Sequence, residues 1–443
     1  MSIITVSILV IISIIAIIVF TSKYKLNAFI ALFIVSLFLA FTTLPAATVI
    51  STIKEGFGNT MASIGFLIIL GAIIGITLDK TGGTISIANY IISKTGEGRS
   101  AQALGITGFI SGLPIFCDSG FIILSGIARS LSSKSRLAMP FMATVLACSL
   151  YSVHCLIPPH PGALAAAGIM DVNIGMLILF GTLFAIPAAV AAFFWSRWLT
   201  EGKNYPPAEI HASDQQSGKD DLPSVFLSFL PIVVPLLLIT IRSLLNLMDK
   251  DKSSIFTKIF NIPGEPVIAL SIGVLLALLL VRGKSVKTIN AVFSEAIEKA
   301  GPILIVTAAG GMFGMVIKST GTGEALGTLL AGSSIGILVP FLIAVVMKTA
   351  QGSSTVAIIT TASFIGPMLA LLGLDTEWGR ILAMLSMGAG SMMISHANDS
   401  YFWVITKFSD IDPSITLKVY SSSTIVMGSV VLFLVWITSF FVL

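Results

Sequence analysis

One lysine, Lys348, lies deep in an apolar stretch and is followed closely by small polar residues. It is the only charged residue in positions 325–374, and a charge at membrane depth normally faces a partner or a cavity. Polar residues that break a membrane helix leave free N–H groups, and such a helix start beside a lysine suits an anion. The residues expected to provide this break are Gln351, Gly352, Ser353, Ser354 and Thr355. We therefore predict an anion site here, the alternative being a lysine that reaches the lipid headgroups from a helix end.

Two carboxylates stand alone in other apolar segments. Asp118 is the only charge in residues 101–128, and Asp399 is the only one in residues 381–406. Either carboxyl group can take up a proton at membrane depth, and the alternative for both is capping of a helix N-terminus. We expect Asp118 to be the proton carrier, with Asp399 as the second candidate.

Residues 154–162 contain three prolines and two histidines, so no helix continues through them intact. Histidines can pass protons or bind the hydroxyl groups of a solute. Prolines, rather than one helical turn, separate the two histidines of this segment, so no metal site is expected. The side chains predicted to bind hydroxyl groups are those of His154, His160, His396 and Asn398, and Ser119 is also expected to bind the solute.

An enzyme is not expected. A hydrolase-like set can be assembled from Ser119, His154 and Asp399, but the sequence has no GxSxG, HExxH or phosphate-binding loop motif. No cofactor is predicted either. The polar residues within the apolar segments are better explained as groups that surround a small hydrophilic solute.

The composition places these residues in a membrane. Of the 443 residues, 55% are hydrophobic and 10% are charged, whereas soluble proteins carry about 25% charged residues. Residues 1–22 are uncharged and lack the basic start of a signal peptide, so we expect a retained first helix. The net charge of +4 indicates no nucleic acid partner, and the three cysteines form no CxxC pair.

The chain is expected to consist of two transmembrane halves, residues 1–200 and 224–443, joined by a polar linker at residues 201–223. Adding 239 to the numbers of Gly71 and Gly75 gives Gly310 and Gly314, and the same shift brings the polar breaks of the first half close to those of the second. Breaks at corresponding positions of two repeats indicate a transporter site between them. We predict an all-α polytopic membrane protein with re-entrant hairpins or broken helices and about 12–14 hydrophobic segments.

The order and spacing of the polar breaks resemble the gluconate permease family, the GntP-type gluconate:proton symporters. The resemblance is carried by GLPIFCDSGFIIL, HCLIPPHPG, GGMFGMVIKSTGTG, QGSSTVA and SHANDSYFW. It implies proton-coupled uptake of a sugar acid across the bacterial inner membrane, by inverted repeats in a homodimer. The chain departs from the family pattern at Cys117, Lys348 and Ala163, where an aromatic residue, Arg and Pro are usual. A lysine in place of a bidentate arginine weakens planar recognition of a carboxylate.

We therefore expect a secondary active transporter that imports gluconate or a related small hydroxy-acid by proton symport. Lys348 and the N–H groups of residues 351–355 are predicted to hold the carboxylate. The alternatives are a carrier of D-serine, glycerate or another organic anion, coupling to sodium, and a channel or sensor with the same fold. The basic loops Arg129–Arg136 and Arg282–Lys287 are expected to face the cytoplasm.

Overall fold

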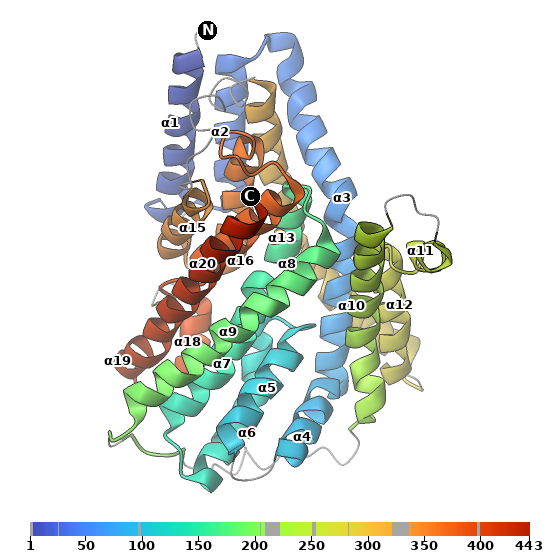
Figure 1. Cartoon of the computed structure of the whole chain (residues 1–443), viewed down its shortest axis with the longest axis vertical. Coiled ribbons are helices and arrows are strands. Elements are labelled where there is room, and N and C mark those ends of the chain that lie inside the picture. The colour runs from blue at the N-terminus through green and yellow to red at the C-terminus, as the bar shows by residue number, and fades with distance from the viewer. Residues whose placement is uncertain are drawn as a thin grey trace.

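The computed structural model is helical throughout the part of the chain that it describes (Figure 1). That part comprises residues 3–24, 26–95, 99–203, 205–208, 222–249, 254–281, 283–320, 336–396 and 399–443. Five of its helices are long and apolar enough to cross a membrane, or seven if each of two bent pairs is one span. Further apolar helices of 10–17 residues accompany them. The prediction of an all-α polytopic membrane protein is confirmed.

The N-terminal helices pack closely against the second half of the chain. They are α1 (Ile3–Ser22), α2 (Ala28–Thr43), α3 (Ala46–Thr81) and α4 (Gly83–Thr95). The backbones of α3 and α13 (Val286–Ser319) nearly touch, because a Cβ atom on Gly56 would lie 2.5 Å from the Gly311 carbonyl oxygen. Helices of the two halves are thus in close backbone contact.

A hairpin of two short helices, hairpin 1, follows α4. It consists of α5 (Ser100–Gly112), a tip at residues 113–116 and α6 (Cys117–Ser135). The next helix is broken into α7 (Met139–Leu156) and α8 (Pro161–Ile169), as its prolines predict, and every residue of α7 is buried. The long span α9 (Ile174–Thr200) completes this half.

The second half contains the same succession of a hairpin and a broken helix. Hairpin 2 consists of α15 (Leu338–Gln351), a turn at residues 352–353 and α16 (Ser354–Ile365). The broken helix consists of α17 (Glu377–Met392) and α18 (Ser400–Phe408). The remaining elements are α10 (Val225–Met248), α11 (Ile255–Asn261), α12 (Pro266–Leu278), η3 (Leu279–Val281), η4 (Gly366–Met368), α19 (Pro413–Thr416), the π-helical turn η5 (Leu417–Ser421) and α20 (Ser422–Val442).

The glycine pairs that suggested the repeat do not make equivalent contacts. A Cβ atom on Gly75 would meet the carbonyl oxygen of Pro114 in hairpin 1, whereas one on Gly310 would meet the Ser363 hydroxyl near the end of α16. The repetition is therefore visible in the order of the elements and not in these glycines.

Candidate functional site

Asp118 lies in the first turn of α6, directly after the tip of hairpin 1. The helix cap is Phe116, so the carboxyl group of Asp118 is not used as the N-cap. One carboxyl oxygen, Oδ1, is buried without a hydrogen-bond partner among the described residues, and Oδ2 lies 3.8 Å from the Cys117 Sγ. A buried carboxyl oxygen without a partner is costly, and this makes Asp118 a candidate for binding a proton or a ligand.

The two histidines of the α7–α8 break hold the tips of the two hairpins. His154 Nε2 lies 3.2 Å from the Thr355 hydroxyl of hairpin 2, while its buried Nδ1 has no partner among the described residues. His160 Nε2 donates a hydrogen bond of 2.6 Å to the Gly112 carbonyl at the end of α5. The ring centroids are 4.8 Å apart. The break in this helix therefore links hairpin 1 to hairpin 2.

Lys348 is completely buried near the end of α15. Its ammonium group lies 2.5 Å from a carboxyl oxygen of Asp399 and donates a second hydrogen bond of 2.5 Å to the Gly352 carbonyl. It also lies 5.5 Å from the centre of the Tyr151 ring, within cation–π range. The lysine is thus not at a lipid-facing helix end, and its charge is neutralised inside the protein.

Asp399 is the N-cap of α18 and accepts a hydrogen bond from the Tyr401 N–H at 3.0 Å. The same side chain accepts a hydrogen bond from the Ser395 hydroxyl and forms an ion pair with Lys348. The helix cap considered for this aspartate is therefore present, together with a buried ion pair, while its role as a proton carrier stays a prediction. Its carboxylate has a partner for each oxygen, unlike that of Asp118.

A cavity of about 380 Å³ lies where the first turns of α6, α16 and α18 meet. Its wall includes both aspartates, His154 and the hairpin 2 residues Ser353–Val356. The first N–H groups of a helix have no acceptor within that helix, and three helix starts therefore offer hydrogen-bond donors and positive partial charge to one cavity. Such a cavity suits a small anionic solute.

Several predicted site residues do not line this cavity. Lys348 and Gly352 lie behind it, and His160 lies beside it at hairpin 1. Ser119 and His396 are half-buried and are also absent from its wall. Asn398 and the side chain of Gln351 lie outside the described residues.

The cavity also has walls that the sequence did not indicate. They come from the start of α2, from Pro302, Ile303 and Val306 of α13, and from Tyr151 and Tyr401. The two tyrosine rings are 5.6 Å apart, and their hydroxyl groups donate to the carbonyls of Ser391 and Ala147. The adjacency of Tyr401 to Asp399 and of Tyr151 to His154 was a usable signal for these two, because three residues or fewer separate each pair in sequence.

Broken helices that meet at a cavity with two carboxyl groups in its wall, within a protein of several membrane spans, are typical of secondary transporters. The model of the GntP family permease matches residues 4–441, and the chain belongs to this family. It is 32% identical over 431 residues to the inner membrane permease YgbN of Escherichia coli K12, a match that covers 94% of each chain. It is 29% identical to a gluconate permease of Pseudomonas aeruginosa PAO1, covering 95% of this chain and 94% of that one.

A solved structure supports the fold. The YdaH transporter of Alcanivorax borkumensis superposes with a TM-score of 0.62 over 90% of each chain, at 14% sequence identity. The protein is thus a multi-pass permease of the bacterial inner membrane and not an enzyme. The family, the fold class, the membrane location and the absence of an enzymatic role are confirmed, while the roles of the individual site residues stay predictions.

Proposed function

We propose that the protein imports gluconate or a closely related sugar acid together with protons. The observation that carries this proposal is the set of charges at the cavity. Among the described residues, the carboxyl groups of Asp118 and Asp399 face it, and the ammonium group of Lys348 lies directly behind Asp399. An entering carboxylate would add a third negative charge against one positive charge. Buried charges are costly unless neutralised, so a proton that enters with the anion lowers the cost of binding.

Asp118 is the proton carrier in this proposal. The Asp399 carboxylate is stabilised by an ammonium group, a hydroxyl group and a backbone N–H. Among the described residues, Asp118 has no ion-pair partner and its Oδ1 has no hydrogen-bond partner. Protonation at Asp118 therefore removes the less stabilised of the two negative charges and leaves the Lys348–Asp399 pair intact.

The N–H groups of Ser354 and Thr355 are proposed to bind the carboxylate of the sugar acid. They belong to the first turn of α16, which opens into the cavity, and a helix start binds anions through its free donors and dipole. Lys348 adds a positive charge from beneath Gly352, to whose carbonyl it donates. His154 lines the cavity and its Nδ1 has no partner among the described residues, so we propose that it binds a hydroxyl group of the solute.

Uptake into proteoliposomes tests the proposal. Labelled gluconate should accumulate under an imposed inward proton gradient without sodium, and a protonophore should abolish the accumulation. Accumulation that requires sodium instead would contradict proton coupling. A competition panel of gluconate, glycerate and D-serine identifies the substrate, and preference for D-serine would contradict a sugar acid.

A Lys348→Gln variant that still inserts into the membrane tests the role of the lysine. We expect uptake to be lost, and an unchanged affinity for the anion would contradict the role. The homodimer implied by the family resemblance is also part of the proposal, and the molecular mass of the protein in nanodiscs tests it.

A further inference from the structure

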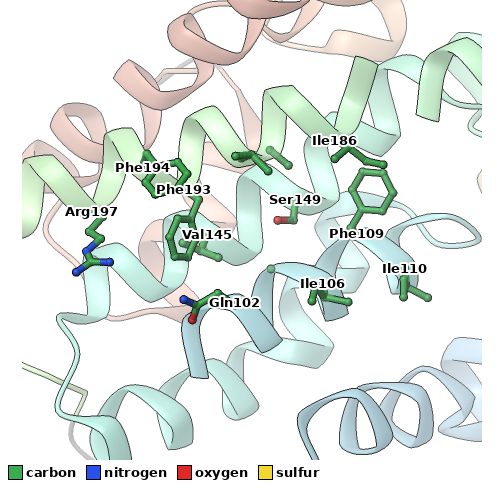
Figure 2. Close-up of a pocket in the computed structure, with 13 residues that line it drawn as sticks. Gln102, Ile106, Phe109, Ile110, Val145, Ser149, Ile186, Phe193, Phe194 and Arg197 are labelled. Atoms are coloured by element: carbon green, nitrogen blue, oxygen red, sulfur yellow. The ribbon is translucent and has the colours of Figure 1, made fainter. Parts of the chain in front are cut away.

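A second cavity lies on the outer surface of the helix bundle, away from the transport site. It is a groove of about 560 Å³ between α5, α7 and α9 (Figure 2). Its walls are almost entirely aliphatic and aromatic side chains, and its polar residues are Arg197, Gln102 and Ser149. Among the described residues it is larger than the cavity at the helix starts, and the transport proposal assigns it no role.

The groove is closed on the protein side and open toward the lipid. Its floor is formed where α5 and α7 approach closely, because a Cβ atom on Gly105 would lie 3.2 Å from Val145 Cγ1. At its edges, Ile106 and Val190 are 47% exposed and Phe194 is 61% exposed. Because α9 is long and apolar enough to be a membrane span, exposed aliphatic side chains along it face hydrocarbon. The natural occupant of the open groove is therefore a lipid chain.

The length of the groove matches one leaflet of a bilayer. Figure 2 shows Arg197 at one end of the row of lining side chains on α9 and Ile186 at the other. Eleven helical positions separate them, which corresponds to about 16 Å of helix rise. Half of the hydrocarbon thickness of a bilayer is about 15 Å. With Arg197 at the headgroup level, Ile186 lies near the bilayer midplane.

Aromatic residues mark the Arg197 end as the membrane interface. The rings of Trp195 and Trp198 are 5.1 Å apart, and Trp198 is 65% exposed. Tryptophan is enriched at the level of the lipid headgroups. The positive charge of the groove is thus at the depth at which a lipid phosphate lies.

Arg197 has donors to offer a phosphate. Its Nη2 is 3.6 Å from a carboxyl oxygen of Glu201, but both side chains are more than half exposed. Exposed ion pairs of this kind contribute little to stability, and a guanidinium group has five N–H donors in a planar fork that suits phosphate. Gln102 lies across the groove near the same end and adds an amide (Figure 2).

We propose that this groove binds an anionic phospholipid, with one acyl chain between α5, α7 and α9 and the headgroup phosphate at Arg197. The site touches the transport machinery through α5, which is the first arm of hairpin 1. A bound chain fills the space between that arm and α9. The proposal does not depend on which solute the cavity at the helix starts accepts.

Native mass spectrometry of the full-length, delipidated protein tests the proposal. The protein is titrated with phosphatidylglycerol or with phosphatidylcholine of the same acyl chains. We expect one molecule of phosphatidylglycerol to bind tightly and phosphatidylcholine to bind more weakly. In Arg197→Gln, phosphatidylglycerol should bind about tenfold more weakly, because hydrogen bonds to a charged group are lost. Lys203→Gln is the matched control, since Lys203 is exposed beyond the end of α9 and outside the groove, and it should behave as wild type.

A groove-filling variant distinguishes a specific chain site from general charge attraction. Ala189→Phe places a ring in the groove and should weaken both lipids. If Arg197→Gln bound phosphatidylglycerol as tightly as the wild type does, the proposal would be overturned. Arg197 is exposed, so its replacement should not disturb folding, and this test stands even if Ala189→Phe fails to fold. A change of oligomeric state in Ala189→Phe with unchanged lipid binding would show that a second copy of the chain occupies the groove, which also overturns it.

Discussion

At the scale of single residues, the ion pair of Lys348 and Asp399 is buried beside the proposed transport cavity. The lysine is fully buried and the aspartate is 4% exposed. The pair joins hairpin 2 to the α17–α18 break, across 51 residues of sequence. Replacing both members of such a pair with neutral groups is often tolerated, whereas removing one leaves an uncompensated buried charge at a cost of about 3–5 kcal/mol.

We therefore expect non-additive effects of Lys348→Met and Asp399→Asn on stability. Each single variant should show a clearly lower melting temperature in detergent, and the double variant should recover most of the loss. Thermal unfolding of the four proteins measures this coupling as a double-mutant cycle. Lys203→Met is the control for loss of an exposed lysine and should leave the melting temperature unchanged. Additive losses in the double variant would show that the two charges do not depend on each other.

A second prediction concerns Asp118. In Asp118→Asn the side chain can no longer carry a proton, but it keeps its size and its place in the first turn of α6. Exchange of labelled for unlabelled substrate should persist, while accumulation driven by a proton gradient should be lost. Both are measured in the same proteoliposomes. The exposed Asp410, outside the cavity, provides the control variant Asp410→Asn, and gradient-driven accumulation by Asp118→Asn would assign the proton to another group.

At the scale of helices, hairpin 1 is positioned by a glycine of α3. A Cβ atom on Gly75 would lie 2.2 Å from the Pro114 carbonyl oxygen at the hairpin tip, a backbone atom that cannot rotate away. Phe116 at the tip, and Cys117 and Asp118 in the first turn of α6, line the cavity. The shape of the cavity thus depends on the absence of one methyl group on α3.

We expect Gly75→Ala to displace the tip of hairpin 1 and to reduce uptake strongly. Overpacking of this kind typically costs about 1–3 kcal/mol, so the protein should still fold while Asp118 moves out of place. Gly58→Ala on the same helix is the control, because nothing lies within 4 Å of its added Cβ atom. Uptake rates normalised to inserted protein compare the two. Equal rates would mean that the tip is free to shift without loss of function.

The breaks in the helices could be predicted from the sequence, but their mutual contacts could not. Charged, small and proline residues interrupt long apolar runs at Asp118, His154–Gly162, Lys348 and Asp399, and the structure breaks its helices at or beside each of them. The pairing of Lys348 with Asp399 depends on how hairpin 2 packs against the α17–α18 break, which no local sequence pattern encodes. The cavity wall from Pro302, Ile303 and Val306 was missed because these residues resemble those of any other apolar helix.

At the scale of the whole molecule, basic residues gather at one end. The start of α13 meets the end of α3 through a Glu295–Lys80 ion pair, and the end of α6 meets the linker through Ser132 and Ala208. Figure 1 shows the ends of α6 and α9 and the start of α5 at this same end. The basic residues found there are Lys94, Arg99, Arg129, Lys134, Arg136, Lys203, Lys284 and Lys287. Loops rich in lysine and arginine stay in the cytoplasm.

This end should therefore face the cytoplasm, and hairpin 1 should enter the membrane from that side. The other end of α9 carries Asp171, which pairs with Arg380 next to the turn that contains Asp375. The positions Lys134 and Asp375 are both exposed and lie at opposite ends of this span. They give a matched pair of sites for a single cysteine.

We expect a membrane-impermeant maleimide added to intact spheroplasts to label Asp375→Cys but not Lys134→Cys. After permeabilisation both should be labelled. The native Cys117, Cys148 and Cys155 are buried, so the wild-type protein gives the background. The reverse pattern would place hairpin 1 on the periplasmic side. The start of α5, the end of α6 and the Arg197 end of the groove all lie at the basic end of the molecule. The same result therefore also decides which leaflet supplies the anionic lipid.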